Sequence, residues 1–467
     1  MNPSIKETET LLSEIAGAFK NILSSAEANS STASLMALKW AVEVQADRSI
    51  RAGFERLVFD VSNDDKYFRT SLLNLLHDLN QVFEGPISGD IALQALRNER
   101  VPIGILRKAI RLLHESSLKQ IGQTALARLF QQLRQSSVTQ PDQLETPTSL
   151  RELTIQLLDP KPGMKIHDLT CSGGSWLLGA GVHTRDIDGG LSMTHLSGQE
   201  LNPARADDAR VSLKIAGFDT DVRAGDTLLA PQHQRGGKLD LFDRVFSHPP
   251  FGSNWEPNIK LNSDPFGRFT SRTMMRCSAN LAFVLHALAV LNVKGRAVIL
   301  NPINSLSHSG SDRSIRQHLV DADHLEQVIQ LPANLFQGTD VQPCVLVLSK
   351  AKPKHLLNRV LFLDMSRDFD GPKTQRHLTK QGIQRALVAS SGPSTPSYSA
   401  IVSRDQIAAK DYDLSGRLYL ESSHWTGESF EAEVAKLARM MSERDRVEAQ
   451  IKSLLNQLPP SGANLTP

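Results

Sequence analysis

The sequence predicts an α/β protein in which a doubly wound parallel sheet follows an all-α N-terminal region. Two observations carry this prediction. Apolar residues recur at helical spacing up to about residue 135, with almost no strand signal. From about residue 165 onwards, short apolar runs alternate with helical stretches, which is typical of parallel βαβ units. The length of 467 residues exceeds one compact core, so more than one domain is expected.

The first predicted domain, residues 1–135, is helical. Its apolar residues cluster at helical spacing in the stretches Leu35–Val44, Leu72–Leu79 and Ile103–Leu113. The segment Ser136–Thr148 is polar and contains two prolines, so it is predicted to be a linker or an approach loop to an active site.

The second predicted domain, residues 136–370, is expected to hold a seven-stranded Rossmann-type sheet. Its strands are expected at the apolar runs Lys165–Leu169, Ser197–Leu201, Asp221–Ala224, Asp243–Ser247, Arg296–Asn301, Glu326–Leu331 and Cys344–Leu348. Helices are expected between most of these runs, at Pro203–Ala216, Asn280–Val293 and Ser314–Ala322.

The third predicted region, residues 371–467, is a C-terminal extension. A further strand at Val360–Asp364 precedes it, and it contains a Ser/Pro-rich loop at Ser390–Ser399. It is predicted to end in a charged, coiled-coil-like helix over Ser429–Leu458. That helix either folds back on its own domain or docks on a partner, and the sequence leaves both open.

The bulk properties restrict the class of protein. A net charge of +2 does not indicate a surface that binds polyanions everywhere, so any nucleic-acid contact must come from local patches. The three cysteines show no pairing or metal-ligand spacing, so no metal site is predicted and a cytoplasmic setting is expected. A signal peptide and a membrane-spanning run are not predicted either, and no membrane association is expected.

A nucleotide-type cofactor site is predicted where the first three strands end. The small residues Ser172–Gly174 follow the strand ending at Asp168 and precede a helix, which lets the backbone approach a ligand closely. Glu200 ends the second strand, the position from which an acidic residue binds ribose hydroxyls. Asp226 follows the third strand and can accept a hydrogen bond from an adenine amino group. Each acid alone is more simply a helix cap or a solvated charge, but three in succession favour the site.

These motifs resemble a known family. Asp168–Leu178 resembles the cofactor loop of the N-6 adenine DNA methyltransferases of the type I modification-subunit branch, and Gly198–Pro203 is similar to their G-Q-E-[LI]-N-P motif. Leu325–Lys350 is similar to their strand–loop–strand segment, so that the strong resemblance covers about half of the chain. The predicted cofactor-binding residues are Thr146, Asp168, Thr170, Ser172, Gly173, Gly174, Glu200, Asn202, Asp226 and Thr227.

The resemblance implies a function as well as a fold. It implies S-adenosylmethionine as cofactor and methyl transfer to the N6 atom of a flipped adenine in double-stranded DNA. It also implies a specificity subunit as partner, with a restriction subunit or a second copy of the chain as further candidates. A methyltransferase acting on RNA or protein fits these motifs less well.

The reaction loop departs from the family pattern. His248, Pro249, Pro250 and Phe251 stand where the family carries N-P-P-F, and they are the predicted catalytic residues. The imidazole of His248 can still accept a hydrogen bond when neutral, but protonation would remove that acceptor. Ser172 replaces a usual glycine, and Leu144–Glu145 replaces two aromatic residues before Thr146. Two hypotheses therefore remain: an active adenine methyltransferase, or a catalytically impaired relative that serves as a DNA-binding or scaffold subunit.

A DNA-contacting helix is predicted after the reaction loop. Basic side chains outnumber acidic ones between Phe251 and Val320, and Arg268, Arg272 and Arg276 recur every four residues. A helix would place these three on one face, where they could contact phosphates. A solvated basic face is the simpler reading of the spacing alone.

Overall fold

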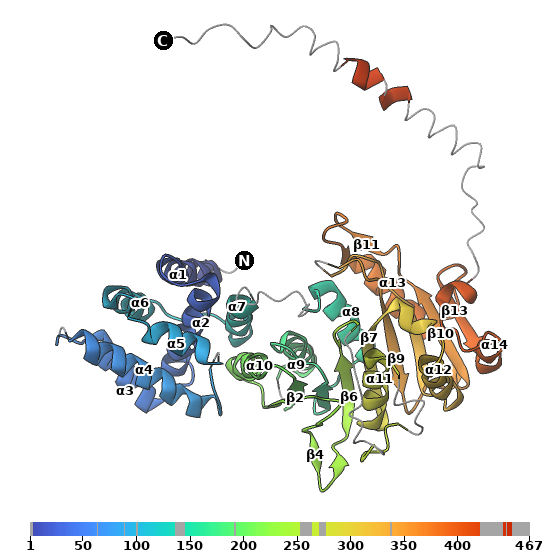
Figure 1. Ribbon diagram of the computed structural model, residues 1–467, viewed down its shortest axis with the longest axis horizontal. Coiled ribbons are helices and arrows are strands. Elements are labelled where there is room, and N and C mark those ends of the chain that lie inside the picture. The colour runs from blue at the N-terminus through green and yellow to red at the C-terminus, as the bar shows by residue number, and fades with distance from the viewer. Residues whose placement is uncertain are drawn as a thin grey trace. The chain divides into compact units, whose positions relative to one another are not determined.

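The computed structural model describes residues 3–62, 64–87, 89–99, 101–135, 145–190, 193–252, 264–269, 277–336, 339–420, 442–444 and 446–450. Among these residues, the N-terminal region forms a bundle of seven helices. The helices are α1 (Pro3–Lys20), α2 (Ser25–Glu43), α3 (Arg48–Val58), α4 (Asp65–Val82), α5 (Gly89–Arg97), α6 (Ile103–Glu115) and α7 (Gln123–Gln135). This confirms the all-α character predicted for the region (Figure 1).

Helix α2 is the centre of this bundle. It is buried continuously from Ala28 to Val42 and contacts each of the other six helices. Its N-terminus is fixed by a capping box in which Ser24 and Glu27 exchange side-chain and backbone hydrogen bonds. The small polar residues of its first turns let neighbouring helices approach closely, which is why a helix without a polar face is stable here.

The main sheet contains nine strands in the described residues, in the order β13-β10-β8-β9-β7-β6-β1-β2-β3. Their bounds are β1 (Lys165–Asp168), β2 (His195–Glu200), β3 (Thr220–Ala224), β6 (Phe242–Ser247), β7 (Leu291–Pro302), β8 (Leu325–Gln330), β9 (Pro343–Ser349), β10 (Arg359–Asp364) and β13 (Ser399–Ser403). The seven predicted strands and the further strand at Val360–Asp364 are all present, and the predicted α/β fold class is confirmed.

Two features of the sheet differ from a purely parallel arrangement. Strand β9 is antiparallel to both neighbours, β7 and β8, because only a loop connects β8 to β9 and no crossover helix reverses the chain. Strand β13 pairs antiparallel with β10 at the edge of the sheet. It begins at Ser399, where the expected Ser/Pro-rich loop ends.

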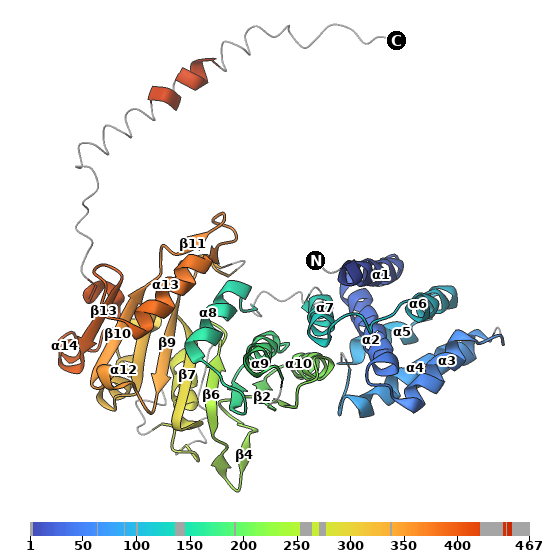
Figure 2. The same ribbon diagram turned by 180° about the vertical axis from the view of Figure 1, so that it is seen from behind.

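Helices cover both faces of the sheet. Helices α8 (Thr148–Leu158), α9 (Ser175–Asp188), α10 (Pro203–Ile215) and α13 (Lys380–Ser391) lie on one side, and α11 (Ala279–Ala289) and α12 (Ser311–Asp321) on the other (Figures 1 and 2). Helix α11 is shorter than predicted, because the chain passes directly into β7 at Leu291. Helix α7 of the N-terminal bundle packs against α10 and α9, so that the bundle and the sheet form one compact unit, residues 1–419.

The remaining elements are small. They are β4 (Gln234–Arg235), β5 (Lys238–Leu239), β11 (Phe369–Asp370), β12 (His377–Leu378), α14 (Arg404–Ala408) and the 3₁₀ turns Ile303–Leu306, Lys354–Leu356 and Gly416–Leu418. Residues 420–467 form a second unit, in which 442–444 and 446–450 are helical and Val447 is exposed. The rest of the predicted helix over Ser429–Leu458 lies outside the described residues. Within the described part of the chain, no helix has both the length and the apolarity needed to cross a membrane.

Candidate active site

The loop after β1 has the geometry expected of a close-approach turn. Gly174 has φ 79° and forms the N-cap of α9, and a Cβ atom there would lie 2.9 Å from the Cβ of Ala209 on α10. Ser172 also has a positive φ, 47°, a conformation that favours glycine. A serine therefore occupies, with some strain, the backbone conformation that the usual glycine of the family would adopt freely.

Glu200 links this loop to the next strand. Its Oε2 accepts a hydrogen bond from the backbone N–H of Ser172 at 2.9 Å, and its Oε1 accepts one from the N–H of Asn202 at 2.9 Å. Asn202 caps α10, because its Oδ1 accepts from the N–H groups of Ala204 and Arg205. A carboxylate has about four acceptor positions, so Glu200 keeps acceptor capacity for ligand hydroxyls.

Asp168 is buried at the end of β1. Burial raises its pKa to about 8, while the N–H of Thr170, which donates to its Oδ1 at 3.0 Å, acts in the opposite direction and the nearby charge of Glu200 raises it further. Without a cation nearby this carboxyl is therefore mostly protonated at neutral pH. A cationic ligand in the pocket would favour its ionised form.

The residues after β3 also make contacts within the fold. Asp226 Oδ1 accepts from the backbone N–H groups of Leu228 and Leu229, both at 2.9 Å, and thus caps the turn that it begins. The hydroxyl of Thr227 donates to the carbonyl of Leu169 at 2.7 Å. Thr227 therefore ties the segment after the third strand to the loop after β1.

Thr170 joins the cofactor loop to the predicted reaction loop. Its Oγ1 lies 3.1 Å from Oγ of Ser247, the last residue of β6, and accepts a hydrogen bond from the N–H of His248 at 3.0 Å. This is possible because β1 and β6 are adjacent and parallel, with Asp168 in register with Phe246. The two motifs, about 80 residues apart in sequence, consequently meet at one edge of the sheet.

His248 is enclosed by aromatic rings. It stacks on Phe336 with ring centroids 4.8 Å apart and meets Phe251 edge-on at 5.3 Å. Its Nδ1 lies 3.0 Å from Oγ1 of Thr146. Burial lowers the pKa of His248 to about 4, so the ring is neutral at physiological pH. Of the two charge states considered from the sequence, burial thus favours the neutral one, which keeps an acceptor nitrogen.

Pro249 and Pro250 follow this histidine in the loop. The side-chain amide of Asn280, near the start of α11, lies at the 3.5 Å limit of hydrogen bonding to the carbonyl of Pro250. The loop is therefore contacted from two sides, by Thr170 in the turn after β1 and by Asn280 of α11.

The two departures outside the reaction loop meet at one guanidinium group. Nη2 of Arg205 donates to Oγ of Ser172 at 2.8 Å and to Oε1 of Glu145 at 3.0 Å. The same guanidinium lies over Gly173, where a Cβ atom would be 3.5 Å away. Ser172 and Glu145 are thus two parts of one polar cluster, which occupies the position where the family pattern has a glycine and aromatic residues.

The predicted DNA-contacting arginines have different outcomes. Asp264–Phe269 forms turns rather than a helix, and Arg268 is buried, paired with Asp264 at 2.9 Å and bonded to Nδ1 of His286 at 3.2 Å. In this conformation it presents no charge to a phosphate. Arg272 and Arg276 lie outside the described residues. Among the other basic residues between Phe251 and Val320, Arg296 pairs with Glu326 and Arg316 is buried. Part of the excess of basic over acidic side chains in this segment therefore lies inside the protein.

Sequence reasoning missed Phe336 and Arg205. Phe336 follows β8 inside the segment that resembles the family, but nothing in a single sequence places it against His248. Arg205 lies two residues after the Asn202-Pro203 cap, and the charge of Glu145 was the available signal for a basic partner.

A pair of parallel, stacked aromatic rings lies between α9 and β6. Trp176, in the first turn of α9, stacks on Phe246 of β6 with ring centroids 4.2 Å apart and an interplanar angle of 3°. Both rings are almost completely buried, and the Trp176 indole N–H donates to Oγ1 of Thr154 on α8 at 3.0 Å. The pair connects the helix that follows the cofactor loop to the strand that leads into the reaction loop.

Comparisons with known proteins agree with this geometry. The chain is 29% identical over 289 residues to the type I restriction enzyme MpnII methylase subunit of Mycoplasma pneumoniae, an alignment that covers 59% of this chain and 52% of that protein. It is 25% identical over 370 residues to the MjaVII methylase subunit of Methanocaldococcus jannaschii, covering 76% and 62%. The chain thus spans between about half and somewhat under two thirds of these relatives' length.

A solved structure shares the fold. The methyltransferase subunit of a type I restriction-modification system from Streptococcus thermophilus superposes with a TM-score of 0.70 at 20% identity, covering 89% of this chain and all of that one. The sequence pattern of the N-6 DNA Methylase family matches residues 128–428. Because this match spans more than half of the chain, the protein belongs to the N-6 DNA Methylase family.

Proposed function

We propose that the protein is an S-adenosylmethionine-dependent DNA methyltransferase that modifies the N6 atom of adenine. One observation carries the proposal: the adjacent strands β1 and β6 bring the Ser172–Gly174 loop and the loop His248–Phe251 together, and the Thr170 hydroxyl, just after β1, contacts Ser247 Oγ and accepts a hydrogen bond from the N–H of His248. A methyl donor on one loop would then face an acceptor base on the other, as methyl transfer requires.

The residues present fit this cofactor. Its hydroxyl, amino and positively charged groups call for acceptors, and carboxylates stand at three successive strand ends, Asp168, Glu200 and Asp226. Glu200 would hold the ribose, Asp226 the adenine amino group and Asp168 the positively charged end, with Gly173 and Gly174 allowing close approach. When bound, the cofactor supplies an electrophilic methyl group on a sulfonium.

The reaction loop would bind the acceptor adenine. If Nδ1–H of His248 donates to Thr146, its Nε2 is left as an acceptor for an N6 proton, and the ring is too weak a base to become charged near neutral pH. Phe251 would stack on the flipped base. The carbonyl of Pro249, next to His248, is a second acceptor for the amino group.

We further propose that the chain acts as a modification subunit. Relatives are named as methylase subunits of type I restriction enzymes, which agrees with double-stranded DNA as substrate, with a specificity subunit that reads the sequence, and with a restriction subunit or a second copy as further partners. Arg272 and Arg276 remain candidates for phosphate contacts. The names of these relatives do not favour the scaffold alternative.

Two measurements test the proposal. Isothermal titration with S-adenosylmethionine should give micromolar binding by the isolated chain. Incubation with DNA, a specificity chain and cofactor labelled on the methyl group should place the label on N6 of adenine. Absence of cofactor binding by folded protein would overturn the proposed activity, whereas binding without transfer would restore the scaffold alternative.

A further inference from the structure

Helix α7 of the N-terminal bundle faces the cofactor loop with three polar side chains. Gln131, Arg134 and Gln135 are spaced i, i+3 and i+4, so they share one face of the helix. The amide of Gln131 donates to the carbonyl of Gly173 at 3.2 Å and to Oγ of Ser212 at 3.0 Å. Gln135 donates to Glu145, the residue that Arg205 holds at the edge of the loop.

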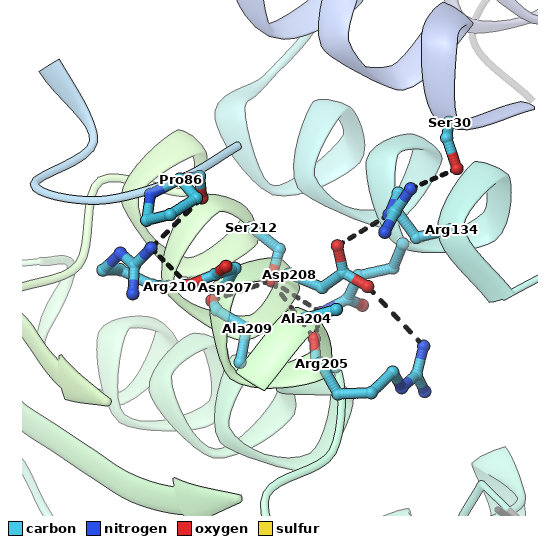
Figure 3. A network of polar contacts seen from close by, with 12 residues as sticks. Ser30, Pro86, Arg134, Ala204, Arg205, Asp207, Asp208, Ala209, Arg210 and Ser212 are labelled. Atoms are coloured by element: carbon cyan, nitrogen blue, oxygen red, sulfur yellow. Dashed lines mark hydrogen bonds and ion pairs between the residues drawn. The ribbon is translucent and has the colours of Figure 1, made fainter. Parts of the chain in front are cut away.

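Arg134 is the charged centre of this face. Its Nε donates to Oδ1 of Asp208 at 2.6 Å, and it also binds the hydroxyl of Ser30 on α2 (Figure 3). The other carboxylate oxygen of Asp208 lies 3.8 Å from Nη1 of Arg205. Arg134, Asp208 and Arg205 are each at most 5% exposed, so their charges are poorly screened by solvent.

We infer that α7 is a structural part of the cofactor site, and that Arg134 is a positioning residue for the Ser172–Gly174 loop. Arg134 satisfies Asp208 and thereby leaves the Nη2 of Arg205 to Ser172 and Glu145. Without Arg134, the buried Asp208 carboxylate has Arg205 as its nearest cation. Arg205 would then move toward Asp208, and the loop would lose its contact with the guanidinium.

Coupling of this kind is reciprocal. If α7 orders the loop for the cofactor, the bound cofactor must in turn stabilise the docking of α7, by the same free energy. The N-terminal bundle would consequently report on the occupancy of the cofactor site, which lies in the other part of the same compact unit. This inference rests on the proposed cofactor binding, but its first step, ordering of the loop by α7, does not.

Helix α10, which carries Asp208, offers a matched control. Arg210 on α10 also reaches the N-terminal bundle, donating to the carbonyls of Phe83 and Pro86, and pairs with Asp207 at 2.6 Å (Figure 3). No described contact joins it to the loop. Arg210→Met should therefore remove a contact between α10 and the Phe83–Pro86 segment while leaving the contacts of α7 and the loop in place.

The experiment compares Arg134→Met, Arg134→Lys and Arg210→Met by hydrogen exchange and titration. In Arg134→Met, the amides of residues 169–174 should exchange roughly tenfold faster and S-adenosylmethionine should bind roughly tenfold more weakly, the scale of ordinary site coupling. Arg134→Lys, which keeps the charge, should restore most of both, and Arg210→Met should match the wild type. Adding cofactor to the wild type should slow exchange in α7.

Equal loop exchange in Arg134→Met and Arg210→Met would overturn the inference. If Arg134→Met does not fold, Gln131→Met removes the hydrogen bond from α7 to the Gly173 carbonyl without removing a charge. Its loop exchange, compared with that of Arg210→Met, then tests whether α7 orders the loop. A wild-type protein that fails to bind the cofactor would contradict the proposed function, and loop exchange in the variants would still decide the role of α7.

Discussion

The buried carboxyl of Asp168 predicts that cofactor binding is strongly pH-dependent. Its pKa of about 8 means that roughly 1% of the unliganded protein is ionised at this position at pH 6 and roughly 9% at pH 7. S-adenosylmethionine carries a net positive charge in this range, since its α-amino group has an ordinary pKa near 8. If the ionised form binds it, the affinity should rise roughly ninefold from pH 6 to pH 7, and about 0.9 proton should be released on binding at pH 7.

Isothermal titration measures both quantities, the second from buffers with different heats of ionisation. Asp168→Asn is the control, because it keeps the shape of the side chain and cannot ionise, so its weaker affinity should be constant between pH 6 and pH 7. It should also remove a stability term: the raised pKa makes Asp168 most favourable below about pH 4 and progressively unfavourable as the pH rises toward 8. Equal wild-type affinity at pH 6 and pH 7 would refute the reasoning.

Three further predictions test other parts of the site. Glu200→Gln should weaken cofactor binding by at least roughly tenfold in a titration. The glutamine amide has only one oxygen, so either the N–H of Ser172 or the N–H of Asn202 loses its acceptor, and the ribose loses a carboxylate acceptor as well. Unchanged affinity would contradict the assigned role. His248→Asn should lower the free energy of urea unfolding by roughly 1–2 kcal/mol through the lost stacking on Phe336, yet keep or raise methyl transfer, since an amide oxygen also accepts the N6 proton; abolished transfer with intact cofactor affinity would instead show that the imidazole itself is needed. Burial lowers the pKa of His286 to about 3, so the stability that the neutral ring contributes is present above pH 6.5 and is lost below it by about 1.4 kcal/mol per pH unit. In His286→Gln, the unfolding free energy should therefore fall less steeply between pH 6.5 and pH 5, by about 1.4 kcal/mol per pH unit. An unchanged slope would argue against a neutral His286.

Most of the sheet was predictable because its strands are apolar runs bounded by small or polar residues. The exceptions have physical causes. Ser399–Ser403 is an edge strand that pairs on one side only, so it needs no strongly apolar sequence. Helix α11 and strand β7 are both apolar and directly adjacent, which hides the boundary near Val290.

The site was predictable as far as it follows strand ends. The alternation of strands and helices predicted that the strands before Asp168, Glu200 and His248 belong to one parallel sheet, and the structure shows that β2, β1 and β6 are neighbours in it. The Arg134–Asp208 pair joins residues 74 positions apart, and the Arg205–Glu145 pair residues 60 positions apart, and neither has a periodic signature. Arg268 was expected at the surface from its spacing, but the acid four residues before it and a histidine of α11 hold it inside.

The stacked rings of Trp176 and Phe246 have a consequence for motion in the site. Two large, flat side chains in contact cannot slide or tilt apart without opening a void in the interior, which is costly. Helix α9 and strand β6 should therefore move as a single rigid body, together with the loops at their ends. In the proposed reaction, this rigid body would then set the separation between methyl donor and acceptor. Any opening that admits a flipped base must come from segments that surround this rigid body.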